Sequence, residues 1–324
     1  MTNMTQDAAG QTRPLSITIG PLQYWWARPA MMAFYAEVAE SAARRVVLGE
    51  VVCSRRNEYK FDDWVALARD LKSAGKEVVL ATQALVMSEA ELRTLRRIAE
   101  QDEFAVEAGD ASALHVLWQA QQARPQRPGF TIGPHINVYS REALQEHAAL
   151  GASCWVPPLE LALDAIGRIN PEAERVAGPA GPMQTEVFAF GRMPLAFSAR
   201  CFTARHHRLN KDECEFRCQQ DADGLLLKTS EGDAFLVLNG IQTQSAALHC
   251  VIGEGAALRA AGATGVRLSP CSRGFARVIA LFDAVLNAGM PAAEALAELR
   301  ALDLPGALVD GFAHRQPGMA PLAA

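Results

Sequence analysis

Residues 45–82 read RVVLGEVVCSRRNEYKFDDWVALARDLKSAGKEVVLAT. The β-branched runs at 45–52 and 77–82 predict two strands, and the segment between them predicts a helix over 62–74 that stops at Gly75. A strand of a parallel sheet is buried on both faces and therefore apolar on both, as residues 45–52 nearly are apart from Glu50. The order strand, helix, strand predicts one repeat of a parallel α/β fold.

The same alternation continues on both sides of this repeat. Six more runs predict strands: 16–22, 104–108, 130–138, 154–156, 185–191 and 265–268. Helical patterns separate them, with Ser88, Asp110 and Ser140 as predicted N-caps. Eight strands interleaved with helices favour a (β/α)8 TIM-barrel-like α/β fold over an open, doubly wound sheet.

The length of the chain suits one domain of this class. Barrels of this kind can hold all of the 324 residues present here. We expect a flexible leader at 1–14, a single barrel domain at 15–304 and a poorly ordered tail at 305–324. An insertion at 192–264, between the seventh and eighth strands, carries several cysteines and a β-hairpin turning at 230–233. Because barrel active sites lie at the loops that follow the strands, the insertion should cover the catalytic face.

Three of the seven cysteines fall within eighteen residues of this insertion, CFTARHHRLNKDECEFRC at 201–218. Cys201, Cys214 and Cys218 stand in a polar, basic stretch, where burial as apolar residues is a poor explanation. Crowded thiolates repel one another unless a cation takes up their charge. The stretch therefore predicts a metal centre. Cys154, Cys250 and Cys271 are instead expected to be small buried residues of the core.

The residues alone do not decide between zinc and an iron–sulfur cluster. His206 and His207 lie between the thiols, so a zinc site with cysteine and histidine ligands would use similar residues. The paired C-x-x-C knuckles of common zinc modules are missing from the stretch. An iron–sulfur cubane needs four thiolates, of which the trio supplies three.

Three further segments carry a family resemblance: GEVVCSRR at 49–56, TEVFAFGRMPLAFSARC at 185–201 and VLNGIQT at 237–243. With them the chain resembles the UbiV family, a branch of the collagenase-like peptidases. The resemblance implies a [4Fe–4S] cluster on Cys53, Cys201, Cys214 and Cys218. It also implies a heterodimer with a UbiU-like paralogue in the oxygen-independent hydroxylation of ubiquinone precursors, with prephenate as the proposed oxygen source.

The composition of the chain bears on its cellular location and on the classes of partner that it can bind. The net charge of −5 argues against general nucleic-acid affinity, which requires a basic face. No apolar run is long enough for a spanning helix and residues 1–14 lack a secretory signal, so we expect a cytoplasmic protein with reduced thiols. Since quinone precursors are very apolar, their delivery calls for a lipid-carrying accessory protein.

Polar residues near the strand ends are candidates for binding a substrate. Glu50, Glu107, His135, Asn137 and Arg192 would lie at the barrel mouth, where Arg192 could clamp a carboxylate. A polar network within the mouth would explain the same residues equally well.

Two functions of other kinds stay open. One is a non-catalytic electron-transfer or structural metal-binding subunit. The other is a collagenase-like peptidase, although the sequence contains neither an H-E-x-x-H nor a G-x-S-x-G signature. No catalytic residue is assigned.

Overall fold

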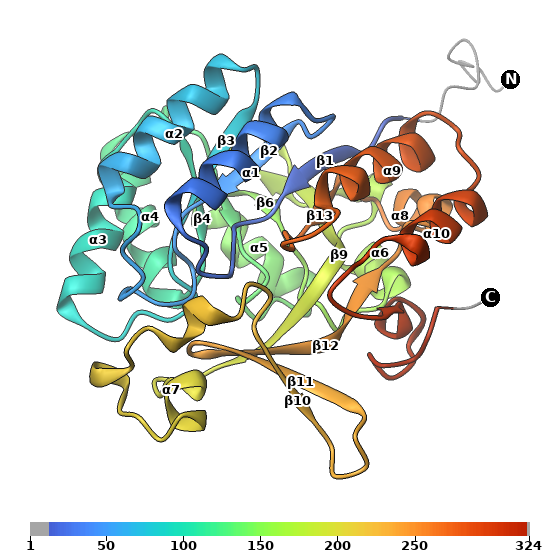
Figure 1. Cartoon of the computed structure of the whole chain (residues 1–324). Coiled ribbons are helices and arrows are strands. Elements are labelled where there is room, and N and C mark those ends of the chain that lie inside the picture. The colour runs from blue at the N-terminus through green and yellow to red at the C-terminus, as the bar shows by residue number, and fades with distance from the viewer. Residues whose placement is uncertain (1–12, 323–324) are drawn as a thin grey trace, which may run out of the picture.

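Eight parallel strands close into a barrel in the computed structural model, which describes residues 13–322 (Figure 1). The barrel strands are β1 (Ser16–Ile19), β2 (Arg45–Leu48), β3 (Glu77–Ala81), β4 (Ala105–Ala108), β5 (Phe130–Ile132), β6 (Ala152–Trp155), β9 (Gln184–Phe197) and β13 (Gly265–Leu268). Sequential strands pair in register, and the pairs β6–β9, β9–β13 and β13–β1 complete the circle. The predicted (β/α)8 fold is therefore confirmed.

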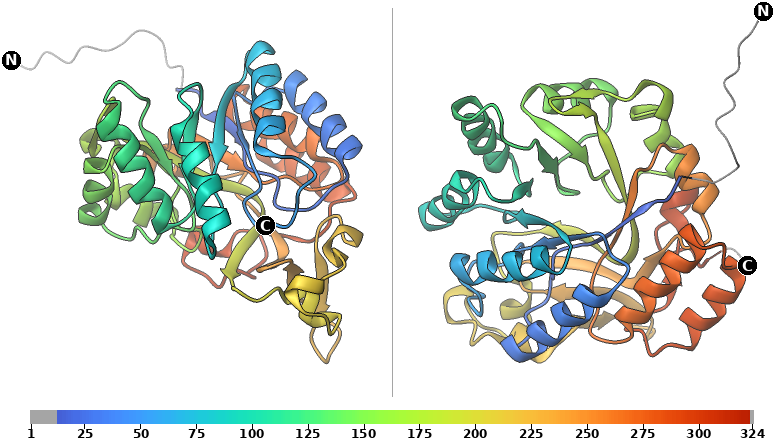
Figure 2. Two further views of the ribbon diagram at one scale, coloured as in Figure 1. Left: turned by 90° about the vertical axis from the view of Figure 1, so that its left-hand side faces the viewer. Right: turned by 90° about the horizontal axis from the view of Figure 1, so that it is seen from above.

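Helices surround the barrel, as the view from above shows (Figure 2). They are α1 (Arg28–Glu40), α2 (Phe61–Ser73), α3 (Glu89–Glu100), α4 (Ala111–Ala123), α5 (Arg141–Ala149), α6 (Leu163–Ile169), α8 (Gly255–Ala260), α9 (Phe275–Asn287) and α10 (Ala292–Ala301). The predicted N-caps are confirmed, because the side chains of Ser88, Asp110 and Ser140 each accept a backbone N–H of the first helical turn.

The strands present different residues to the helices and to the barrel interior. In β13, Val266 and Leu268 belong to the apolar core, whereas the intervening Arg267 is buried among the side chains of other strands. Its guanidinium contacts Glu107 of β4 and Glu186 of β9. The barrel interior is thus held in part by charge, while the layer between strands and helices is apolar.

The insertion leaves the barrel at the far end of β9 and lies below it in Figure 1. It contains α7 (Phe202–His206), two short 3-10 helices at Lys211–Glu213 and Arg217–Gln220, and the strands β10 (Leu225–Lys228), β11 (Ala234–Asn239) and β12 (Gln242–Cys250). β10 and β11 form the predicted hairpin. β12 returns antiparallel to β9, which ties the insertion to the barrel.

The C-terminal segment differs from the poorly ordered tail that we expected. Its described part, to residue 322, contains β14 (Leu308–Val309) and the 3-10 helix η4 (Gly311–His314). Backbone pairing explains the difference, because β14 adds to β12 with Val309 beside His249. Two short strands, β7 (Ala177–Gly178) and β8 (Gly181–Pro182), form a separate ribbon, and η1 (Glu172–Glu174) precedes them.

The flexible leader predicted at 1–14 lies almost wholly outside the described residues. Within them, no helix has both the length and the apolar character to cross a membrane.

Candidate metal centre

The four cysteines proposed as ligands line one pocket, although they come from segments far apart in the chain. Cys53 follows β2, Cys201 caps α7, Cys214 ends the 3-10 helix Lys211–Glu213, and Cys218 lies in the next 3-10 helix. Cys201 is buried and the other three are half-buried. The fold thus brings the local trio and the distant Cys53 together.

The loop that carries Cys53 is shaped by its first two residues. Gly49 has a φ of +140°, and a Cβ there would lie 2.7 Å from the carbonyl oxygen of Ala81, so only glycine fits. The next residue, Glu50, accepts the backbone N–H groups of Val52 and Cys53 on one carboxylate oxygen, both at 2.9 Å. This turn holds the Cys53 backbone toward the insertion.

Within the insertion, hydrogen bonds to Gly240 hold α7 in place. Phe202 N donates to the carbonyl oxygen of Gly240 at 2.7 Å, and Gly240 N donates to the Thr203 hydroxyl at 2.9 Å. These bonds place α7, and with it Cys201, next to the turn between β11 and β12. Glu215 and Phe216 both have left-handed φ values, 48° and 54°, which reverse the chain between Cys214 and Cys218.

A buried arginine supplies positive charge at the pocket. Arg56 lies 4.0 Å from Glu50 and lines the pocket together with Cys218. Burial raises the pKa values of the Cys53, Cys201 and Cys218 thiols, while Arg56 works in the opposite direction on Cys218. Without a cation these thiols favour the protonated form, and a bound metal would reverse that balance. The donor set therefore fits a thiolate-ligated metal group.

The remaining cysteines lie elsewhere. Cys154, Cys250 and Cys271 are 3%, 0% and 3% exposed, and burial raises the pKa of each thiol to about 12. The expectation that they are buried residues is confirmed.

Neither of the two histidines between the thiols lines this pocket. Among the described residues, the pocket lining includes all four cysteines but neither His206 nor His207. Their rings pack edge to face on each other with centroids 5.1 Å apart. The lining of the pocket thus offers sulfur donors and no imidazole.

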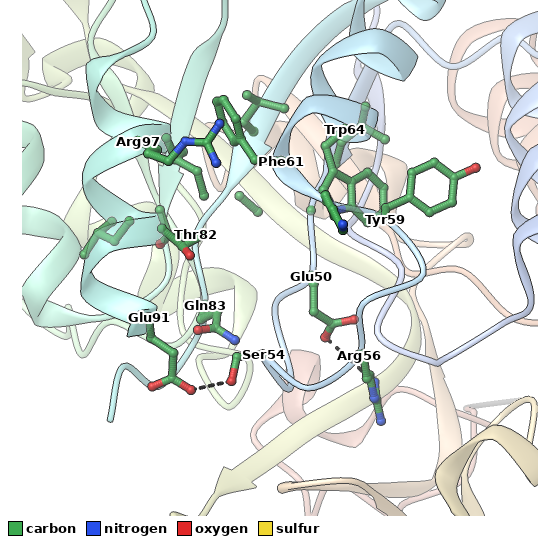
Figure 3. Close-up of a pocket in the computed structure, with 18 of the residues that line it drawn as sticks. Glu50, Ser54, Arg56, Tyr59, Phe61, Trp64, Thr82, Gln83, Glu91 and Arg97 are labelled. Carbon is green, nitrogen blue, oxygen red and sulfur yellow. Dashed lines mark hydrogen bonds and ion pairs between the residues drawn. The ribbon is translucent and has the colours of Figure 1, made fainter. Parts of the chain in front are cut away.

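A larger cleft of about 320 Å³ lies next to the metal pocket, between α2 and α3 (Figure 3). Its upper wall is aromatic and apolar. The ring centroids of Tyr59 and Trp64 lie 4.8 Å apart, and the guanidinium of Arg97 lies over the ring of Phe61. Its floor is polar and includes Glu50. This size and lining are typical of small-molecule sites.

Arg56 lines both the cleft and the metal pocket, so the two cavities share a wall. Burial raises the pKa of Glu50 above its ordinary value, although Arg56 and two backbone N–H groups work against this. The Glu50 carboxylate points toward Arg56 at the bottom of the cleft in Figure 3. A ligand in the cleft would therefore meet polar groups on the side that faces the cysteines.

The other predicted substrate residues lie apart from this cleft. Glu107 is buried and binds Arg267 through two hydrogen bonds, and with His135 it lines a small pocket at the barrel mouth. Asn137 is exposed. Arg192 is 4% exposed, and its guanidinium donates to the backbone carbonyl oxygens of Ser245, Ala246 and Pro305. Of the five predicted residues, only Glu50 lines the cleft.

Sequence reasoning did not single out Arg56, Tyr59, Trp64 or Arg97. Arg56 stood within the motif around Cys53, three residues after the cysteine, and that position was the available signal. The aromatic residues gave no comparable signal, because aromatics at helix starts most often belong to the core.

A family profile and several solved structures match this chain. The profile described as Peptidase family U32 matches residues 31–281, well over half of the chain. The chain is similar to the structure of the U32 peptidase Mk0906, with 11% sequence identity, 83% of this chain and 98% of that chain covered, and a TM-score of 0.41. It is also similar to tryptophan synthase from M. tuberculosis, with 13% identity, 91% of each chain covered and a TM-score of 0.41. The Bacillus megaterium spore cortex-lytic enzyme SleL gives 10% identity, 85% and 75% coverage, and a TM-score of 0.42.

Proposed function

The chain belongs to peptidase family U32, and from that premise we propose that it is an iron–sulfur protein of the UbiV type. It would act in the cytoplasm with a UbiU-like paralogue, in the oxygen-independent hydroxylation of ubiquinone precursors. Prephenate would serve as the oxygen source, and a lipid-carrying accessory protein would deliver the precursor. The observation that carries the proposal is the pocket lined by Cys53, Cys201, Cys214 and Cys218.

The number and type of the donors support an iron–sulfur group. Four cysteines line this pocket, and four thiolates are the usual ligand set of a [4Fe–4S] cluster.

The bound cluster would supply one-electron transfer, the redox capacity that a hydroxylation without dioxygen requires. Arg56 and Lys211, which both line the pocket, would offset the negative charge of four thiolates. The adjacent cleft would bind the organic substrate, with Tyr59 and Trp64 against its ring. Glu50 and Arg56 would orient its polar groups toward the cysteines, and the apolar walls would exclude water.

Metal and sulfide analysis of the anaerobically purified chain tests the proposal. We expect about four irons and four acid-labile sulfides per chain, and loss of both in Cys53→Ala. Cys271→Ala is the matched control, because that thiol is buried outside the pocket; it should keep the cluster. Zinc without sulfide in the parent protein would overturn the proposal.

The alternative roles give different outcomes in activity assays. A non-catalytic electron-transfer or structural subunit would keep the cluster, and changes in its own cleft would leave turnover of the complex with the paralogue unaffected. A collagenase-like peptidase would cleave gelatin or collagen peptides without the paralogue.

A further inference from the structure

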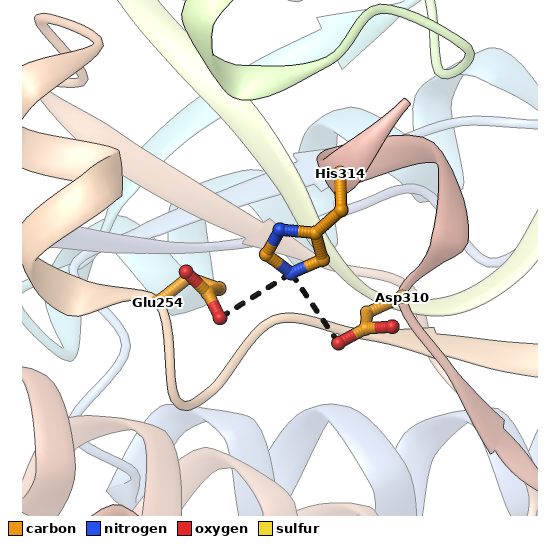
Figure 4. A group of neighbouring side chains, drawn as sticks. All are labelled: Glu254, Asp310 and His314. Atoms are coloured by element: carbon orange, nitrogen blue, oxygen red, sulfur yellow. Dashed lines mark ion pairs between the residues drawn. The ribbon is translucent and has the colours of Figure 1, made fainter. Parts of the chain in front are cut away.

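Three metal-binding side chains gather far from the cysteine pocket, where the C-terminal segment meets the start of α8 (Figure 4). Glu254 directly precedes α8, Asp310 follows β14, and His314 ends η4. The Nε2 atom of His314 lies 3.4 Å from Glu254 Oε1 and 3.5 Å from Asp310 Oδ2. All three atoms lie within 4.8 Å of one another.

These distances suit ligands of one ion better than hydrogen bonds. A charged N–H to carboxylate hydrogen bond is about 2.7–2.9 Å long, well below both observed values. Bonds of about 2.0–2.2 Å from zinc to histidine nitrogen or carboxylate oxygen set neighbouring ligand atoms about 3.3–3.6 Å apart in a tetrahedron. The imidazole nitrogen therefore stands from each carboxylate at the distance that a shared ion would impose.

The carboxylates lack other partners that would explain their convergence. Asp310 is 5% exposed, and within residues 13–322 no hydrogen bond reaches its carboxylate or that of Glu254. In the described residues, the ion pair found for each of the two carboxylates is the one with the His314 imidazole. A carboxylate this buried is normally hydrogen-bonded, paired or bound to a metal.

Backbone hydrogen bonds hold the segments that carry these three residues. Val309 pairs with His249 in the sheet, and the N–H of Ala313 donates to the carbonyl oxygen of Asp310 at 2.9 Å. The N–H of Leu258 donates to the carbonyl oxygen of Glu254 at 2.8 Å. Little backbone entropy would then be lost on binding, which favours metal affinity.

We propose that Glu254, Asp310 and His314 bind one divalent transition-metal ion of the zinc class, with water completing the coordination. An imidazole nitrogen with two carboxylates suits zinc and its neighbours, whereas calcium and magnesium prefer all-oxygen sites with more ligands. The ion would clip the C-terminal segment to the barrel at α8. This site uses no cysteine, so it does not depend on the proposed iron–sulfur function.

Zinc binding to the full, anaerobically prepared chain tests the site. We expect the parent to bind one zinc equivalent that His314→Ala and Asp310→Asn lack. The affinity at this site should fall by more than the roughly 10–100-fold that is typical of a changed outer-sphere contact. Glu254→Gln, which preserves the side-chain shape, covers the case in which another variant fails to fold. His115→Ala, which removes an exposed histidine of α4, is the matched control and should bind like the parent.

Two readouts separate this site from the cysteines. Cobalt held by thiolates has an intense sulfur-to-metal charge-transfer absorption, which nitrogen and oxygen ligands do not produce. The cobalt lost in His314→Ala should therefore be the fraction without that absorption. Zinc should also raise the Tm of the parent and not that of the variant. Unchanged zinc content and an unchanged Tm response in both His314→Ala and Glu254→Gln would overturn the proposal.

Discussion

Arg56 donates a 2.6 Å hydrogen bond from Nη2 to Oδ1 of Asn239, a residue 183 positions later in the chain. Both side chains are buried, and Arg56 also donates to the carbonyl oxygen of Gln23 at 2.6 Å. Two of the segments that carried the family resemblance, around Cys53 and around Asn239, therefore meet in space. Their contact joins the loop after β2 to the insertion at the wall of the metal pocket.

Asn239→Ala should lower the free energy of unfolding by about 2–3 kcal/mol, because it removes the acceptor of the Nη2 group of the buried Arg56 guanidinium. Asn239 also donates to Gln23 and Gln242. Denaturant titration under anaerobic conditions measures the change. Asn137→Ala, at an exposed asparagine, should stay within about 0.5 kcal/mol of the parent. Equal denaturation midpoints for Asn239→Ala and Asn137→Ala would contradict the stabilising role of Asn239.

Glu186→Gln should destabilise the protein by about 3 kcal/mol at neutral pH, because the buried Arg267 loses a charged partner. Burial works to raise the pKa of Glu186, but the charges of Arg267 and Arg45 outweigh it and hold that pKa below its usual range. The ion pairs of Glu186 therefore stabilise the fold fully above the ordinary glutamate pKa of about 4.3 and weaken as the pH falls below it.

The variant should lose part of this acid sensitivity, measured as unfolding free energy against pH. Glu100→Gln, at an exposed position of α3, serves as the control and should follow the parent curve. An unchanged slope in Glu186→Gln would show that other carboxylates dominate acid unfolding.

His135 should make stability fall between about pH 6.5 and pH 4. Burial, and next the charge of Arg267, lower its pKa from 6.5 to about 4, so folding favours the neutral ring. The contribution of His135 to the free energy of unfolding is fully present above the pKa of the ring in the unfolded chain. It declines as the pH falls toward the pKa of the ring in the folded protein. After discounting for partial exposure, His135→Gln should remove about 1–2 kcal/mol of this pH dependence. His115→Ala, an exposed control, should leave the slope intact.

Trp64→Ala should reduce turnover of the complex with the paralogue by about tenfold or more while iron and sulfide contents stay unchanged, since the variant removes an aromatic wall of the cleft. Steady-state assays combined with iron analysis separate binding from cluster assembly. Trp118→Ala on α4 is the control, because it lies outside the cleft lining. Full turnover in Trp64→Ala would remove the cleft from the proposed function.

Arg192→Ala should lower the free energy of unfolding by about 3 kcal/mol, because three carbonyl oxygens lose a charged donor. Thermal or denaturant unfolding measures this loss. The control is Arg93→Ala, at an exposed position of α3, which should unfold like the parent. If Arg192→Ala kept its stability and lost turnover, the predicted role as a carboxylate clamp would stand instead.

Local sequence patterns predicted much of the fold. Strand runs such as residues 77–82 and caps such as Ser88 act over a few neighbouring residues, so their signals are readable without the rest of the chain. The hairpin around 230–233 was predicted on the same basis. Helix α8 and the short strand β14 were missed, because their periods are too short to stand out and β14 depends on a partner far away in sequence.

By itself, the sequence determined the alternation of strands and helices, the clustering of Cys201, Cys214 and Cys218, and the lack of a strongly basic character. Only the tertiary structure decided which residues meet across long separations. Closure of the barrel and return of β12 along β9 bring Cys53 to the trio and Arg56 to Asn239. The same closure directs Arg192 to backbone carbonyls and gathers Glu254, Asp310 and His314. Periodicity records which face of an element is buried, but the partners on that face follow from packing of the whole chain.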